Sequence, residues 1–454
     1  MADVPSKEEA LPATTAEEPA VVEASPTTTK LLREEDVWLP HIGGIATVTF
    51  LSNGVTAAEL IKDKLLQVAK ANPWICGHLT EAKPTGFNLV SPIDAQAIVI
   101  DRCYNTADDD TINSRTEFTQ LVQKLQPYRL KNGRLCVGKQ EETLFQVTVF
   151  NIKKDSESAI LVEMSHSIAD GQTYYQIFNM LSVDIPVKQL TVERKLDLGM
   201  MGETYKDIVG EKEALFPFSA TYMCKVMCMM IGLFGGGGCK PRLYAVDKEK
   251  IKRIKHDFSR EKAATEDVSI SQKKSHTSTS VNYLTTNDIM VSAFANAVQP
   301  TLLEMIINFR GKLPGLTVED AGVYEGSVFF SASQDYETPE AIRATMNGIY
   351  ETPRNIKRLS FDRKSGELPN CAGLMKDTFA LASNWASFAR DLNWGTGVTQ
   401  ILHVPIESFF WPAVIFFKPI PGEIAALVFS RRPLHFDGPI NPFYEDELFP
   451  EMFA

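Results

Sequence analysis

Residues 159–171 read Ala-Ile-Leu-Val-Glu-Met-Ser-His-Ser-Ile-Ala-Asp-Gly, an apolar run that changes abruptly into a polar turn. The branched apolar residues of the first half are typical of a buried β-strand. The turn carries His166 and ends at Asp170 and Gly171. Apolar residues recur at helical spacing after Gly171, and Asp170 is a suitable N-cap for the helix that they predict. His166 is therefore expected at the tip of a buried strand, directly before a helix.

The segment before this stretch completes a β-hairpin. Residues 144–152 read LFQVTVFNI, which is rich in β-branched and aromatic residues, and the polar residues 153–158 predict the connecting loop. Most histidines at strand ends are structural, and the spacing H-x-x-x-D is common by chance. The glycine directly after Asp170, at a strand-turn-helix junction, favours a functional role for His166.

Length and composition limit the class of protein. The chain has 454 residues, enough for two domains or one large two-lobed domain. A net charge of −11 argues against a nucleic-acid partner. The seven cysteines are scattered and lack C-x-x-C spacing, so no metal site is expected and the thiols suit a reducing compartment. The first residues lack the features of a signal peptide, and we expect a cytoplasmic monomer.

Changes of composition divide the chain into four parts. Residues 1–30 are rich in Glu, Ala, Pro and Thr without an apolar period, which predicts a disordered tail. Residues 31–200 form the expected N-terminal lobe with His166. Residues 201–245 form a crossover segment, and residues 246–454 form the C-terminal lobe.

The crossover contains an unusual apolar segment, residues 215–234. It holds Met223, Met227, Met229 and Met230. A membrane-spanning helix needs about 20 apolar residues, and this run is interrupted by Pro217, Ser219 and Lys225. Core packing is the commonest explanation for a methionine-rich stripe. Our hypothesis is a single apolar helix that forms a hydrophobic wall or a peripheral membrane contact, with Lys225 reaching the water.

Residues 166–171 resemble the H-x-x-x-D-G motif of the CoA-dependent acyltransferases, in particular the BAHD family. Four later stretches resemble further motifs of that family, in its order. Residues 285–288 are similar to its S-T-N-D turn, and residues 308–314 to its N-x-R-x-x-L-P. Residues 383–385 are similar to its T-S-W, and residues 391–395 to its D-F-G-W-G. The resemblance implies two chloramphenicol-acetyltransferase-like α/β lobes, each a mixed sheet with flanking helices, and an active-site channel at their interface.

The sequence departs from the family pattern at several positions. Leu392 and Asn393 replace the Phe and the first Gly of D-F-G-W-G, and this motif follows Trp385 at a shorter spacing than usual. Ser327 replaces the Asn of a G-N element. His78 stands where the family has Arg, and we interpret it as structural.

The chemistry of acyl transfer assigns a role to His166. A hydroxyl group is protonated at neutral pH, so its attack on a thioester needs a positioned base. Histidine, with an ordinary pKa of about 6.5, can take that proton and return it to the leaving thiolate. The chain has no G-x-S-x-G elbow, so direct transfer within a ternary complex is expected, without an acyl-enzyme. The predicted function is O-acyl transfer, of groups other than amino-acyl groups, from acyl-CoA to a hydroxyl or amine of a small acceptor, lipophilic ones included.

The resemblance implies roles for the remaining site residues. Asp170 turns away from His166 and pairs with Arg310, so that these two form a structural clamp, to which Asp391 also belongs. Ser383 and Trp385 stabilise the oxyanion.

The resemblance also implies the residues that contact the acyl-CoA co-substrate. These are Gly171, Asn287, Trp394 and Gly395, with Asp391 and Trp394 at the floor of the CoA channel. No tightly bound cofactor is expected.

Two alternatives stay open at this point. The apolar crossover favours a wax ester or diacylglycerol type of acyltransferase, although that group usually has two adjacent histidines and Ser165 precedes His166 here. The altered motif at residues 391–395 also allows a non-catalytic binding protein that resembles an acyltransferase.

Overall fold

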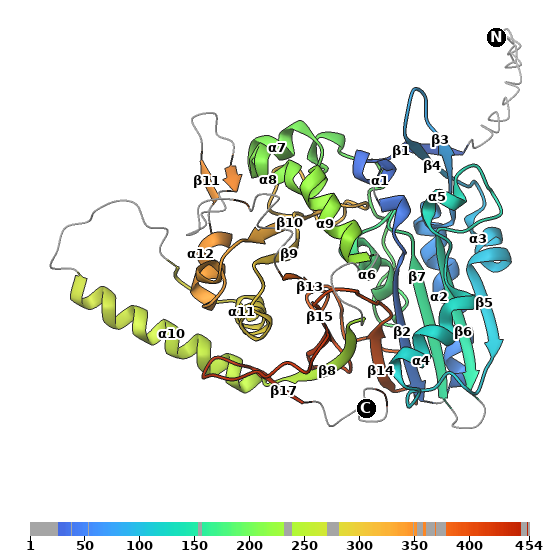
Figure 1. Cartoon of the computed structure of the whole chain (residues 1–454). Coiled ribbons are helices and arrows are strands. Elements are labelled where there is room, and N and C mark those ends of the chain that lie inside the picture. The colour runs from blue at the N-terminus through green and yellow to red at the C-terminus, as the bar shows by residue number, and fades with distance from the viewer. Residues whose placement is uncertain are drawn as a thin grey trace, which may run out of the picture.

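The computed structural model describes residues 26–37, 39–52, 54–152, 157–230, 238–269, 281–347, 349–351, 357–359, 368, 378–445 and 452. Helices pack around two large β-sheets, one in each of two lobes that lie side by side (Figure 1). The predicted two-lobed α/β class is therefore confirmed.

The sheet of the N-terminal lobe has five strands. The central hairpin is β6 (Phe145–Ile152) and β7 (Glu157–Met164), as predicted, and both strands are almost entirely buried because branched and aromatic side chains fill both faces. Helix α2 (Gly54–Ala71) packs on this hairpin. The strand order is β14 (Gln400–Pro405), β2 (Ile45–Ser52), β7, β6, β5 (Tyr104–Asp108).

One strand of this sheet comes from the other half of the chain. Strand β14 pairs antiparallel with β2 and lies at the edge of the N-terminal sheet (Figure 1). The expected division into lobes 31–200 and 246–454 is thus refined, because residues 400–405 belong to the first sheet. The two lobes share a hydrogen-bonded strand pair.

The sheet of the C-terminal lobe has seven strands. One face is covered by α11 (Thr286–Val298) and α12 (Pro339–Met346), and the other faces the N-terminal lobe and residues 216–226 of the crossover. Strand β13 runs parallel to its neighbours β9 and β15, so their carboxyl ends share one edge of the sheet. The order is β10 (Glu325–Phe330), β9 (Leu302–Asn308), β13 (Phe379–Asn384), β15 (Ala413–Phe417), β16 (Ala425–Ser430), β8 (Lys240–Val246), β17 (Phe443–Glu445).

The N-terminal tail is shorter than the sequence predicts. Residues 27–30 form β1 (Thr27–Lys30), which pairs antiparallel with β4 (Phe87–Ser91) beside β3 (His78–Glu81). The prediction of disorder up to residue 30 is wrong for these residues, because the strand pairing satisfies their backbone groups. Residues 1–25 lie outside the described residues.

The apolar crossover segment is not one helix. Helix α8 (Glu211–Leu215) is followed by a 3-10 turn, Phe216–Phe218, and then by α9 (Ala220–Met230). Pro217 lacks an N–H group, and the hydroxyl of Ser219 instead accepts a hydrogen bond from the N–H of Tyr222, which starts the new helix. Residues 231–237 lie outside the described residues.

The crossover packs against the C-terminal sheet. Phe216, Tyr222 and Val226 are buried against Phe329 and Phe379, and Lys225 is only 4% exposed. The expectation that Lys225 reaches the water is wrong, because α9 turns this side chain toward the sheet. Among the described helices, none has the length and apolarity needed to cross a membrane.

Candidate active site

The turn after β7 presents His166 at the interface between the lobes. Strand β7 ends at Met164, and α6 (Gly171–Asn179) begins seven residues later. The carboxylate of Asp170 accepts a hydrogen bond from the N–H of Thr173 at 2.8 Å, which confirms the predicted N-cap. The N–H of Ser165 donates to the carbonyl of Leu144 at 2.8 Å, and this bond fixes the start of the turn.

The side of the His166 ring that carries Nδ1 is buried. Within the described part of the chain, this Nδ1 atom has no hydrogen-bond partner. Burial lowers the pKa of His166 from its ordinary value to about 4, although the charge of Asp170 and the backbone of Ala169 act in the opposite direction. The imidazole is consequently neutral at neutral pH and available as a base.

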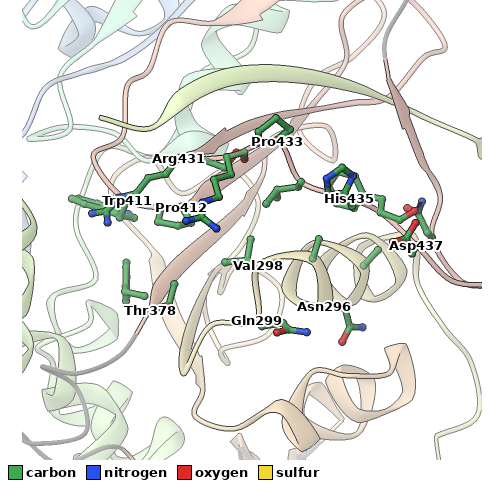
Figure 2. A pocket seen from close by; sticks show the side chains of 18 of the residues that line it. Asn296, Val298, Gln299, Thr378, Trp411, Pro412, Arg431, Pro433, His435 and Asp437 are labelled. Carbon is green, nitrogen blue, oxygen red and sulfur yellow. Dashed lines mark hydrogen bonds between the residues drawn. The ribbon is translucent and has the colours of Figure 1, made fainter. Parts of the chain in front are cut away.

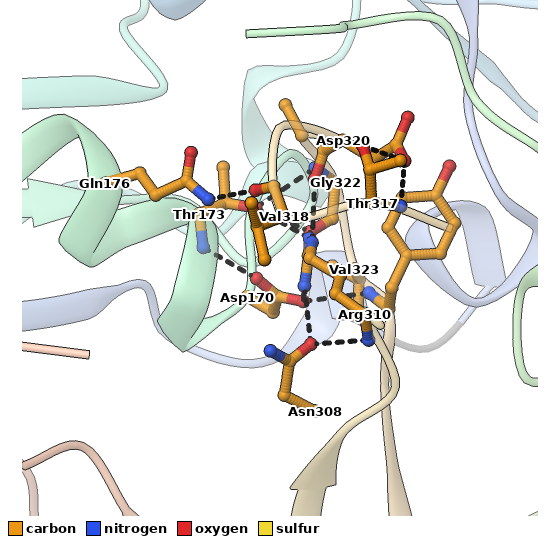
Figure 3. A network of polar contacts seen from close by, with 12 residues as sticks. Asp170, Thr173, Gln176, Asn308, Arg310, Thr317, Val318, Asp320, Gly322 and Val323 are labelled. Atoms are coloured by element: carbon orange, nitrogen blue, oxygen red, sulfur yellow. Dashed lines mark hydrogen bonds and ion pairs between the residues drawn. The ribbon is translucent and has the colours of Figure 1, made fainter. Parts of the chain in front are cut away.

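Asp170 and Arg310 come together in a buried ion pair (Figure 3). The Oδ2 atom of Asp170 lies 2.6 Å from Nη1 of Arg310, and both side chains are at most 1% exposed. The same oxygen accepts a hydrogen bond from the N–H of Tyr324 at 2.8 Å. Both carboxylate oxygens are thus directed at α6 and at the C-terminal lobe, and no hydrogen bond joins them to His166 among the described residues.

Arg310 binds a whole loop to the turn. Its Nε donates to the carbonyl of Asp320 at 2.7 Å and its Nη2 to the carbonyl of Gly322 at 2.8 Å (Figure 3). Nη2 also donates to the hydroxyl of Thr173 at 2.9 Å. A guanidinium group with this many acceptors fixes the position of residues 320–324 against the start of α6.

A second buried ion pair, which the sequence did not indicate, supports the same turn from the other side. Nε of Arg194 lies 3.0 Å from Oε2 of Glu35, which belongs to α1 (Arg33–Val37), and both side chains are 0% exposed. Arg194 also donates to the carbonyls of Ile168 at 3.0 Å and Ala321 at 2.9 Å. Glu35 accepts from the N–H of Val323 at 3.0 Å. The carbonyl of Ile168 lies within the His166 turn, so this pair holds that turn directly.

Ser383 and Trp385 lie beside the first residue of α6. Nε1 of Trp385 donates to the hydroxyl of Ser383 at 3.1 Å. A Cβ atom added to Gly171 would lie 3.9 Å from Nε1 of Trp385 and 3.7 Å from the ring of Phe388. The structure therefore brings the end of β13 and the end of the His166 turn into contact, although more than 200 residues separate them in the chain.

Asn287 and Asp391 lie at the edge of this arrangement. Asn287, at the start of α11, accepts a hydrogen bond from Asn384 at 2.9 Å. Asp391 pairs with Lys418 at 3.2 Å, with side chains 49% and 26% exposed. Exposed pairs contribute about 0–1 kcal/mol, so the Asp391–Lys418 pair stabilises the loop much less than a buried pair would.

Trp394 and Gly395 connect the loop before β14 to the N-terminal lobe. Trp394 is buried and packs edge-on against Phe178 of α6, with ring centroids 6.1 Å apart. Gly395 has a φ of +103°, and a Cβ atom there would lie 2.6 Å from the side chain of Leu60. This glycine is required for backbone conformation and for close approach to α2.

Two further titratable residues near the turn were not singled out by the sequence. His403 is buried, with Nδ1 2.8 Å from the hydroxyl of Thr49 and Nε2 3.1 Å from that of Tyr175, and burial lowers its pKa to about 3. Burial, with the charge of Asp170, raises the pKa of Glu325 to about 8, and the N–H of Gly171 hydrogen-bonds to it. His403 connects β14, β2 and α6, while burial and the charge of Asp170 favour the protonated form of Glu325.

No protein-family model matches the sequence, and no curated protein is significantly similar to it. Solved structures do match. TRI101 of F. graminearum, complexed with coenzyme A and T-2 mycotoxin, is 13% identical, with 89% of this chain and 95% of that chain covered and a TM-score of 0.52. Vinorine synthase is 14% identical, with coverages of 91% and 92% and a TM-score of 0.51.

A third match is the first condensation domain of the calcium-dependent antibiotic synthetase, in complex with a substrate analogue. It is 10% identical, with coverages of 90% and 91% and a TM-score of 0.51. Likeness at such low identity establishes the fold alone. TRI101 and vinorine synthase are BAHD acyltransferases, so the chain has the two-lobed fold that these acyltransferases and the condensation domain share, as its motifs predicted.

Proposed function

We propose that the protein transfers an acyl group from acyl-CoA to a hydroxyl or amine of a small acceptor, with His166 as the general base. The observation that carries this proposal is the close approach of Gly171, which follows the His166 turn, to Nε1 of Trp385, whose N–H donates to the hydroxyl of Ser383. The complexes of TRI101 with coenzyme A support a CoA thioester as the co-substrate.

His166 would act through Nε2, because Nδ1 is buried. The neutral imidazole takes the proton of the acceptor while the new C–O bond forms at the thioester carbon. When the C–S bond breaks, the imidazolium gives this proton to the sulfur of the leaving CoA. A histidine whose pKa is lowered to about 4 is a weak base but a strong acid once protonated. The low pKa therefore favours the second proton transfer.

Trp385 and Ser383 would stabilise the oxyanion of the tetrahedral intermediate. The indole N–H donates to the Ser383 hydroxyl at 3.1 Å, so the hydroxyl proton is free for the oxyanion, and the indole N–H would turn from Ser383 to the oxyanion as it forms. Removal of one such donor typically costs about 10²–10³ in kcat. Gly171 would allow the CoA chain to approach the backbone, because a side chain there would occupy the space in front of Trp385.

The remaining CoA contacts are part of the same proposal. Asn287 would face the CoA at the start of α11, while Trp394 and Gly395 would support the floor of its channel through their packing on α6 and α2. Asp170 and Arg310 would hold the lobes in register and take no part in proton transfer.

The test of this function is acceptor-dependent release of free CoA thiol. The purified protein is incubated with a panel of acyl-CoAs and an extract of alcohols and amines, and the acylated products are identified by mass spectrometry. Product formed in proportion to released thiol supports transfer. Binding of acyl-CoA without release in any combination would favour the non-catalytic alternative.

Peripheral membrane contact through the crossover is a separate part of the proposal. Leu215 and Met227 are large apolar side chains that are 37% and 55% exposed, which supports such a contact. We expect Met227→Gln to weaken the affinity for phospholipid vesicles, measured by sedimentation, about twofold to fivefold, in line with the loss of roughly 0.5–1 kcal/mol of apolar burial. Unchanged sedimentation in Met227→Gln would remove this segment as a membrane contact.

A further inference from the structure

A cavity of about 950 Å³ lies at the end of the seven-stranded sheet where β13 and β15 begin (Figure 2). Its walls are the last turn of α11 (residues 296–299), the loop 431–437, the residues Trp411 and Pro412 before β15, and Lys225 of α9. We call this space the distal cavity. Pockets that hold small organic molecules have volumes of about 300–1,000 Å³, so the distal cavity can take a ligand of that size.

The distal cavity is separate from the His166 turn. Phe379 lines it, and Ser383 lies four residues further along β13 on the same face of the sheet. At about 3.3 Å per residue the two positions are about 13 Å apart. Leu381, between them, packs into the cluster formed by Phe216, Tyr222 and Phe329. A ligand in the distal cavity consequently does not touch the proposed reacting atoms.

The side chains that line the distal cavity are mostly cationic where they are charged. Lys225, Arg431 and Arg432 contribute positive charge, and His435 contributes an imidazole ring. Asp437 is the one carboxylate among the described lining residues. Figure 2 shows Arg431 and His435 on the loop, across the cavity from α11. In a chain with a net charge of −11, a hollow with this local charge selects anions.

The rest of the lining is aromatic and apolar. Phe379, Phe410, Trp411 and Phe436 contribute to it. Trp411 packs edge-on against Phe379, with ring centroids 6.0 Å apart, which holds the indole in place. The carboxyl end of α11, which carries a partial negative charge, forms the wall across from the loop 431–437 (Figure 2). An anionic group is therefore favoured beside residues 431–432, and an apolar body beside Trp411.

We infer that the distal cavity binds small amphiphilic anions, in which an aromatic or aliphatic body carries a carboxylate or phosphate group. Arg431 and Arg432 would bind the anion, since a guanidinium group pairs with either group through two parallel hydrogen bonds. Phe379, Trp411 and Phe436 would contact the body. This binding is independent of the proposed acyl transfer.

The first test uses three probes with one body and different head groups: phenylacetate, phenyl phosphate and 2-phenylethanol. Each is titrated into the full-length wild-type protein by calorimetry, with the total tryptophan fluorescence of the protein as a second signal. We expect saturable binding of at least one anion, with the neutral alcohol bound about tenfold more weakly or worse. The better anion identifies the head group. Equal binding of the alcohol, or no saturable binding of either anion, would overturn the inference.

The second test places the binding in the distal cavity. The exposed Arg431 and Arg432 are replaced together by glutamine, which keeps a polar side chain at each position. Affinity for the anion is expected to fall about tenfold or more, while Arg260→Gln, on the exposed side of α10 (Lys248–Ser269), keeps it. His166→Ala should also bind the anion normally. Binding that survives in the Arg431/Arg432 variant or disappears in His166→Ala would assign the ligand to another site.

Discussion

The His166 turn and the loop 391–395 both resemble motifs of one acyltransferase family, but the molecule holds them in different ways. Two buried ion pairs, Asp170–Arg310 and Glu35–Arg194, fix the turn, and the carbonyl of Ile168 accepts a hydrogen bond from the second pair. The loop has the exposed pair Asp391–Lys418 and the packing of Trp394. Of these two motifs, only the loop departs from the family pattern, at Leu392 and Asn393.

This difference shows where sequence can vary in such a fold. A buried charge that loses its partner costs several kcal/mol, so neither member of a buried pair can change alone. An exposed pair is screened by water and contributes little. The contacts of the turn are mutually dependent, whereas the loop is held mainly by a buried indole and by the backbone of Gly395, which has a positive φ.

The largest expected effect is the loss of kcat on removal of His166, which separates the chemical role of the turn from the ion pairs that hold it in place. His166→Ala should lower kcat about 10²–10⁴-fold, because the base is lost while the two ion pairs remain. Acyl-CoA affinity and the melting temperature should stay close to those of the wild type. His78→Ala is the matched control, since this histidine lies on β3 and should keep full turnover. Near wild-type kcat in His166→Ala would remove His166 from the mechanism.

Breaking the Glu35–Arg194 ion pair tests how much this pair stabilises the fold around the turn. Arg194→Met leaves the carboxylate of Glu35 buried and unpaired, which should destabilise the fold by about 3–5 kcal/mol. The measurement is unfolding in urea, together with kcat. In the double variant Glu35→Gln/Arg194→Met the loss should be smaller than the sum of the single losses, because the two side chains act as a pair. Losses that simply add would show that the pair is not coupled.

The sequence predicted the parts of the site that depend on local pattern. The hairpin and the cap at Asp170 follow from short stretches in which the side-chain period and the turn residues agree. Ser383 and Trp385 were indicated only by their resemblance to a family motif, and their role in the site stays a prediction. The Glu35–Arg194 pair could not be predicted, because 158 residues separate its members and Glu35 lies in an acidic run typical of a solvated surface. The two side chains form a buried ion pair only because distant elements of the fold cover them.

The prediction of one apolar helix with Lys225 in water was wrong for a related physical reason. Its composition predicts an apolar helix, but whether Lys225 faces water or protein depends on the rotation of α9 against the sheet. A single proline and the cap at Ser219 set that rotation by breaking the segment in two. Likewise, the assignment of β14 to the N-terminal sheet depends on pairing with β2, which is some 350 residues away.

The pH dependence of kcat/KM should distinguish a histidine whose pKa is lowered by burial, as in His166, from an exposed histidine with an ordinary pKa. With a folded pKa of about 4, His166 stays neutral as the pH falls through 6.5, so kcat/KM should be nearly constant between about pH 5.5 and 7.5 and should fall only below about pH 5. The unfolded imidazole takes up its proton near pH 6.5. Folding stability from His166 and His403 is therefore complete above that pH and is lost as the pH falls toward 4. An acid limb of kcat/KM centred near pH 6.5 would contradict a buried base.

The smallest effect is expected at the loop. Asp391→Asn and Lys418→Ala should each change the free energy of unfolding by less than about 1 kcal/mol, because the side chains are 49% and 26% exposed and water replaces the lost contact. The measurement is urea unfolding under the conditions used for Arg194→Met, with kcat/KM for acyl-CoA alongside. Trp394→Phe is the informative companion, since it keeps an aromatic ring against Phe178 and removes the hydrogen bond from Nε1 to Gln400. A loss above 2 kcal/mol in Asp391→Asn, about twice the largest value usual for an exposed pair, would show that the loop is clamped as firmly as the turn. The contrast between the two motifs would then need another cause, because exposure alone could not explain why only one of them departs from the family pattern.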